Sequence, residues 1–200
     1  MNTIDVNDVY KTPKAHLIDE HKDKDEPHFF GVSIKKLCVL YIFTLGLYSL
    51  VYFYQHWKVY KIHNNLKINP VLRTIFAIFF VNSLFQIIGN AARERNIARL
   101  PAFTALAVLY IITSLASGIA SNMPGYKMYT VIGTVVSLSS TLIGLYPLYR
   151  VQRVANAINN DEAGTINARF TAINWVFIVL GAFVWLMTIL GLYAQLSSVR

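Results

Sequence analysis

Five long stretches of this chain contain no charged side chain and no histidine, and this feature limits the possible folds more than any other. They cover residues 37–54, 74–89, 102–121, 128–148 and 170–193. Crossing the hydrocarbon core of a bilayer takes about 20 helical residues, and lipid offers no hydrogen-bond partner to an open backbone. We therefore predict an all-α, polytopic integral membrane protein with about five transmembrane helices.

The composition supports lipid as the solvent. Hydrophobic residues make up 55% of the chain and charged residues only 14%, whereas a soluble domain carries about a quarter charged residues. The formal charge is +8, but the basic residues lie between the apolar segments, as in membrane loops, and not on one soluble face. We predict no nucleic-acid partner.

The first 28 residues differ sharply from the rest. They hold seven of the ten acidic residues and few large apolar side chains, so they bury too little surface to offset the entropy of ordering. We predict a disordered tail over 1–28 and a helical membrane domain over 29–200. Tyr10, Pro13 and Leu17 form a small apolar island in the tail, which indicates either a recognition peptide or an inert solvated leader.

The basic residues set the orientation, because Lys and Arg favour cytoplasmic loops. With five full spans and a cytoplasmic N-terminus, twelve basic residues lie inside and six outside. The alternative has three full spans, with 37–54 and 74–89 as hairpin or re-entrant segments that enter and leave on one face. Sixteen basic residues then lie inside and two outside. Gly46 in the middle of the first segment, and the sixteen residues of the second, favour this alternative.

A weak internal repeat connects two loops. The residues from Tyr54 to Asn69 resemble those from Tyr149 to Asn167, and each copy contains an Asn-Asn pair. With five spans the copies lie on opposite faces of the membrane, and with two hairpins they lie on the same face. Chance similarity is the third reading.

Three pieces near the start resemble a family of small bacterial inner-membrane proteins known only as a domain of unknown function. They are Val32-Ser33 with Lys35-Lys36-Leu37, then Thr44-Leu45-Gly46-Leu47-Tyr48, then Phe53-Tyr54 with Trp57. The resemblance covers roughly residues 29 to 194 and departs from the family pattern at Val51-Tyr52, where a Tyr-Trp pair is common. It implies a multi-pass protein of the bacterial inner membrane, and it brings no activity and no catalytic residues.

The apolar segments contain none of the ionisable groups that proton relays and intramembrane proteases need. We predict no enzyme activity, no cofactor and no metal site, since the histidines and acids of the tail lack a fold to fix their geometry. One polar stripe follows a helical face of segment 74–89. It consists of Asn82, Gln86, Asn90 and Arg93, and it indicates either contact between helices or the lining of a polar cavity.

Two groups of residues predict a cytoplasmic or interfacial surface that anchors loops at headgroups or binds a partner. The first is Trp57, Lys58, Lys61, Asn64 and Asn65, and the second is Arg150, Arg153, Asn159, Asn160 and Arg169. Small residues recur four apart in segments 102–121 and 128–148. They predict close helix packing, within one chain or between copies in a homo-oligomer.

The leading functional hypothesis is a non-enzymatic accessory or scaffold protein of the inner membrane that acts through another membrane or cytoplasmic protein. The alternative is a small transporter or channel that uses the polar face of segment 74–89. A lipid-modifying enzyme is the third hypothesis.

Overall fold

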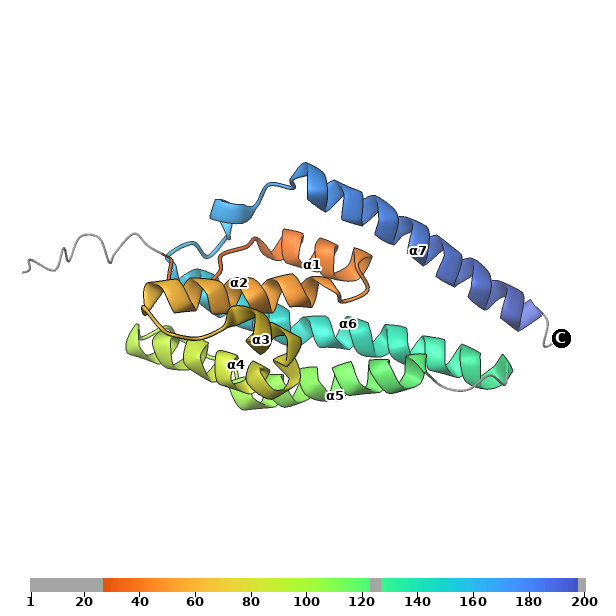
Figure 1. Cartoon of the computed structure of the whole chain (residues 1–200), viewed down its shortest axis with the longest axis horizontal. Coiled ribbons are helices and arrows are strands. Elements are labelled where there is room, and N and C mark those ends of the chain that lie inside the picture. The colour runs from red at the N-terminus through yellow and green to blue at the C-terminus, as the bar shows by residue number, and fades with distance from the viewer. Residues whose placement is uncertain (1–26, 123–126, 198–200) are drawn as a thin grey trace, which may run out of the picture.

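The computed structural model describes residues 27–122 and 127–197, and these form helices and no strands. The all-α prediction is therefore confirmed for this part of the chain. Figure 1 shows the longest helix, α6, running through most of the molecule with the other helices alongside. The elements are α1 (Ile34–Phe43), α2 (Tyr48–His63), α3 (Pro70–Ile75), α4 (Ala77–Glu94), α5 (Phe103–Ser121), α6 (Lys127–Ile158), the 3-10 helix η2 (Thr165–Asn167) and α7 (Ala172–Ser197).

Three helices are long and apolar enough to cross a membrane. They are α5, the part of α6 from Val131 to Ile158, and α7, with 19, 28 and 26 residues. At 1.5 Å per residue their lengths are about 28, 42 and 39 Å, against a hydrocarbon core of about 30 Å. Among the described residues the prediction of about five spans is not confirmed, because segments 37–54 and 74–89 are broken.

Segment 37–54 breaks at a tight turn between α1 and α2. The amide of Gly46 donates to the carbonyl of Tyr41 at 2.8 Å, and the amide of Leu45 to that of Ile42 at 3.1 Å. This is the Schellman pattern, which ends a helix with a residue of positive φ. Leu45 has φ 51° and Gly46 has φ 88°. The chain therefore turns back, and α2 returns beside α1 (Figure 1).

Segment 74–89 breaks as well, at Phe76, between the six residues of α3 and the start of α4. The backbone of Phe76 leaves the helical region, with φ −95° and ψ 35°. Helix α4 then buries one face in the core, through Val81, Leu84, Phe85 and Ile88. Its exposed side carries Phe79 at the start of the helix and mostly polar residues after it, such as Asn82, Asn90 and Arg93, and these polar residues keep α4 from being among the candidate spans.

The small residues of α5 and α6 pack these two helices together. The hydroxyl of Ser117 lies 3.0 Å from that of Ser137 and 3.2 Å from that of Thr141. Short side chains let the two backbones approach, and the hydroxyls pair in place of water. These faces are thus used inside one chain.

Helix α7 touches the rest of the molecule mainly at the end of α1. A Cβ on Gly181 would lie 1.8 Å from the carbonyl oxygen of Phe43. One turn on, the indole of Trp185 donates to the carbonyl of Ile42 at 2.9 Å. Gly181 therefore lets α7 cross α1 in backbone contact, and Trp185 adds a second donor to the carbonyl that already accepts from Leu45.

We expect Gly181→Ala to lower the free energy of unfolding by about 2 kcal/mol, since the added methyl group forces α7 away from a backbone atom. Chemical unfolding in detergent, followed by circular dichroism, measures this loss. Gly191→Ala is the matched control, because a Cβ there meets nothing within 4 Å. Equal responses of the two variants would contradict the contact between α7 and α1.

Three helices end at the same end of the molecule, α2, α4 and α6 (Figure 1). Each finishes in a Schellman turn with an asparagine at positive φ, Asn65 at 48°, Asn96 at 54° and Asn160 at 56°. The two Asn-Asn pairs of the sequence repeat thus occupy equivalent helix ends at one end of the molecule.

Candidate functional site

Three side-chain amides follow one face of α6 near its end, at Gln152, Asn156 and Asn159. Asn156 pairs with the backbone of Val32: its Nδ2 donates to the carbonyl at 3.0 Å, and its Oδ1 accepts from the amide at 3.4 Å. Asn159 does the same for Phe29, donating to the carbonyl at 2.7 Å and accepting from the amide at 3.3 Å. Each side-chain amide thereby satisfies both the N–H and the C=O of one residue outside the helices, as a neighbouring strand would do in a sheet.

Gln152 completes this arrangement and links it to α2. Its Nε2 donates to the carbonyl of Phe30 at 2.9 Å and to Oδ1 of Asn156 at 2.7 Å. Its Oε1 lies 3.0 Å from Nε2 of His56. Because Oε1 can only accept, Nε2 of His56 must carry the hydrogen. We call Gln152, Asn156 and Asn159 the amide clamp, since together they hold the non-helical segment 28–32.

His56 is fully buried beside the clamp. Its ring centroid lies 4.4 Å from that of Tyr52, and neither Nδ1 of His56 nor the hydroxyl of Tyr52 has a hydrogen-bond partner among the described residues. Burial lowers the pKa of His56 to about 4, against a smaller opposing effect of the bond to Gln152. The imidazole is therefore a neutral donor near pH 7 and serves the clamp.

The loop after α6 closes over the same segment. Gly164 has φ 67°, and a Cβ there would lie 2.5 Å from the carbonyl of Val32, so no larger residue fits. The amine of Lys36 donates to Oδ1 of Asn167 at 2.6 Å and to the carbonyl of Arg169 at 2.8 Å. Burial lowers the pKa of the Lys36 amine. The start of the membrane domain is thus held from two sides.

A polar cavity of about 440 Å³ lies next to the clamp, between the ends of α2 and α4. The rings of His28 and His63 lie 3.9 Å apart at its wall, and the guanidinium of Arg95 lies 2.6 Å from Nε2 of His28. Asn90 and Glu94 also line it. In the part of the chain that the structure describes, no three metal-ligating side chains gather here or elsewhere.

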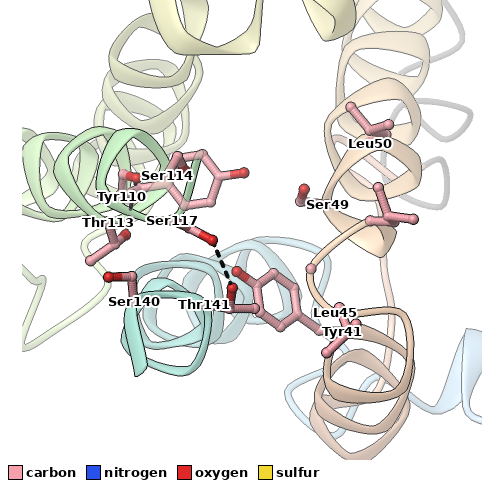
Figure 2. A pocket seen from close by; sticks show the side chains of 12 residues that line it. Tyr41, Leu45, Ser49, Leu50, Tyr110, Thr113, Ser114, Ser117, Ser140 and Thr141 are labelled. Carbon is pink, nitrogen blue, oxygen red and sulfur yellow. Dashed lines mark hydrogen bonds between the residues drawn. The ribbon is translucent and has the colours of Figure 1, made fainter. Parts of the chain in front are cut away.

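A second cavity, of about 280 Å³, lies between the turn after α1 and the helices α5 and α6 (Figure 2). None of the described residues that line it is charged, and the bond between Ser117 and Thr141 crosses one wall. The cavity can therefore hold water or an uncharged polar group. Eight hydroxyl side chains line it: Tyr41, Ser49, Tyr110, Thr113, Ser114, Ser117, Ser140 and Thr141.

The polar stripe of α4 lies on the outer face of that helix. Asn82 is exposed, and Gln86 donates to the hydroxyl of Thr104 on α5 at 2.7 Å. Arg93 donates to Oδ1 of Asn90, and Asn90 reaches the rim of the polar cavity. The stripe thus provides one helix contact at Gln86 and one cavity residue at Asn90. Within the described residues it does not line a continuous channel.

The prediction that Trp57 lies on the interfacial surface is wrong, because its side chain is only 1% exposed. It packs in the core, and the guanidinium of Arg73 covers its ring at 4.3 Å. The sequence pattern was misleading here because an aromatic residue beside lysines is typical of the interface. Lys58 is exposed beside it, Lys61 is half-buried, and the amide of Asn64 caps the carbonyl of Tyr60.

The second surface group divides in the same way. Asn159 belongs to the amide clamp, whereas the side chains of Arg150 and Arg153 contact tyrosines of their own helix. Arg150 donates to the hydroxyl of Tyr146 at 2.7 Å, and Arg153 to that of Tyr149 at 3.3 Å. The side chain of Arg169 is exposed.

The predicted tail peptide, Tyr10, Pro13 and Leu17, lies outside the described residues. His28, which we assigned to the tail, belongs to the clamped segment, because its amide donates to Asn159 at 3.0 Å. Sequence reasoning missed Gln152, Asn156 and His56. The signal that could have found the amides is their spacing of four and three, which places them on one helical face together with Asn159.

Comparison of the chain with protein-family models, with curated proteins and with solved structures finds no match. The resemblance to the domain of unknown function stays a prediction.

Proposed function

We propose that this chain is a non-enzymatic accessory or scaffold protein of the bacterial inner membrane, which presents its N-terminal tail to a protein partner. The observation that carries the proposal is the amide clamp. Its three side-chain amides, of which Gln152 and Asn156 are fully buried, make hydrogen bonds to the backbone of residues 28–32. The point where the tail joins the membrane domain is therefore fixed, and a tethered peptide reaches effective concentrations of the order of millimolar near a co-resident partner.

For the topology we propose three full spans, α5, α6 and α7, with a cytoplasmic N-terminus. Helices α1 and α2 form one hairpin and α3 and α4 the other, each entering and leaving on the cytoplasmic face. Two features support this arrangement. Apolar residues at both bends are exposed, with Leu47 at 69% and Phe79 at 76%, and sixteen of the eighteen basic residues then lie inside.

Cysteine labelling tests this topology. In a Cys38→Ser background, we expect Lys67→Cys to resist an impermeant maleimide in intact cells and to react after permeabilisation. Five full spans put this loop outside, so labelling of position 67 from outside would reject the hairpins. Asn160→Cys is the inside control for both arrangements, and Asn122→Cys is the outside control.

Photocrosslinking in cells tests the function. With a photoreactive residue at position 10, we expect one specific protein adduct that is lost when Pro13→Ala is combined with Leu17→Ser. Asn159→Ala should weaken the adduct several-fold, because residues 28 and 29 lose their anchor. Asn64→Ala is the matched control, since Asn64 only caps its own helix.

The absence of any adduct, together with unchanged growth after deletion of residues 2–26, would reject the scaffold proposal. An adduct that persists in the doubly substituted tail would reject the tail as the recognition element.

The hydroxyl-lined cavity of Figure 2 supports a second candidate, a small transporter or channel for an uncharged polar solute. Its path would run between the turn after α1 and the helices α5 and α6, and not along the stripe of α4. Flux of glycerol into reconstituted vesicles tests this candidate. A rate lowered by Thr141→Val, and unchanged by Thr104→Val outside the cavity, would support it.

A further inference from the structure

An apolar groove of about 580 Å³ lies between α7 and the hairpin of α1 and α2. Its walls include Leu40 and Phe43 of α1, Val51 of α2, and Phe177 and Val184 of α7. Most of the described lining residues are large and apolar. A groove of this size and character suits a hydrophobic chain.

The walls of the groove are fixed by contacts at one side. Gly181 touches the carbonyl of Phe43, and Trp185 donates to that of Ile42. These contacts set the distance between α7 and α1 and keep α7 from collapsing onto α2. The groove therefore stays open unless something outside the chain fills it.

The groove faces the lipid. Helix α7 is a candidate span with only 11% of its most apolar window buried, and the groove residue Phe177 is 50% exposed. Water is excluded from the hydrocarbon core, and an unfilled gap there forfeits the dispersion contacts of the side chains around it. The group available to fill the groove is an acyl chain of the surrounding bilayer.

Positive charge lies where a headgroup would sit. Lys36 precedes Leu40 by four residues on the same face of α1, and so lies about 6 Å nearer the start of the helix. Its amine holds the backbone of Arg169 at 2.8 Å, just before α7 begins. The side chains of Arg169 and of Lys35, the chain neighbour of Lys36, are both exposed. Basic residues near a membrane surface attract anionic lipids.

We propose that this groove binds one anionic phospholipid of the bilayer, with an acyl chain between α7 and the α1–α2 hairpin and the phosphate at Lys35 and Arg169. The site concerns a ligand of the membrane domain, and it is independent of the protein partner of the tail.

Native mass spectrometry tests the site. The probe is an equimolar mixture of phosphatidylglycerol and phosphatidylcholine in nanodiscs, from which the full chain is released. We expect one retained phospholipid per chain, with phosphatidylglycerol favoured about thirtyfold, since two charge contacts of about 1 kcal/mol each convert to that ratio. Val184→Trp should lower the lipid-bound fraction at least tenfold by filling the groove. Val179→Trp is the matched control, because Val179 lies on α7 outside the groove.

Val51→Trp fills the groove from the opposite wall and replaces Val184→Trp if that variant loses its helical circular dichroism. Lipid retention equal to that of the unmodified chain in a folded groove variant would overturn the site. Lys35→Gln combined with Arg169→Gln should keep one lipid but remove the preference for phosphatidylglycerol. A preference that survives this pair would overturn the headgroup assignment.

Discussion

Gln152→Leu is expected to lower the free energy of unfolding by about 4 kcal/mol, because each buried polar group left without a partner costs about 1 to 3 kcal/mol. Leucine is close in size but removes three hydrogen bonds. The carbonyl of Phe30 and Nε2 of His56 lose this partner, and the amide oxygen of Asn156 keeps only the amide of Val32. Chemical unfolding in detergent measures the loss.

The matched control is Gln55→Leu, the same exchange on a half-buried residue of α2. We expect it to change stability by less than about 0.5 kcal/mol, as for surface substitutions. If both variants lose the same stability, the cost belongs to the change of residue type, and the clamp does not have the role assigned to it.

Acidification is expected to remove about 3 kcal/mol of stability between pH 7 and pH 4 through His56 alone. Burial lowers the pKa of the folded imidazole to about 4, from an unfolded value of 6.5. Between these two values the unfolded chain binds more protons, so stability falls as the pH falls. Above pH 6.5 this contribution is complete and constant.

A His56→Gln variant should therefore show a flatter dependence of stability on pH between 6.5 and 4, even if it is less stable at pH 7. His63→Gln is the control, because His63 lies at the wall of the polar cavity and outside the clamp. An unchanged slope in His56→Gln would assign the acid sensitivity to other groups.

The sequence predicts α5, α6 and α7 well, because hydropathy alone decides whether an unbroken apolar run can cross a membrane. Segment 37–54 shows the limit of that argument. Its composition equals that of a span, but the positive φ of Leu45 and Gly46 ends α1 there. Hydropathy does not detect a turn of four residues, and only the glycine indicated it.

The candidate site was harder to predict, for a different reason. The clamp joins residues 122 to 131 positions apart, such as Val32 with Asn156 and Phe29 with Asn159. No local spacing reports such a pairing. Side-chain amides near a helix end are also typical of an exposed surface, and the sequence predicts Asn159 to lie on such a surface. Trp57 failed similarly, because the sequence does not show that Arg73 covers it.

The distance along the chain between the clamp and the segment that it holds affects biogenesis. Residues 28–32 leave the ribosome about 130 residues before Asn159 does. Translation proceeds at about 5 to 20 residues per second, so residues 28–32 are made roughly 7 to 26 seconds before the clamp amides that bond to them. During that interval the backbone of Phe29 and Val32 stays hydrated or is held by a chaperone. Cotranslational assembly is therefore expected to finish last at the N-terminal end, after α6 has been inserted.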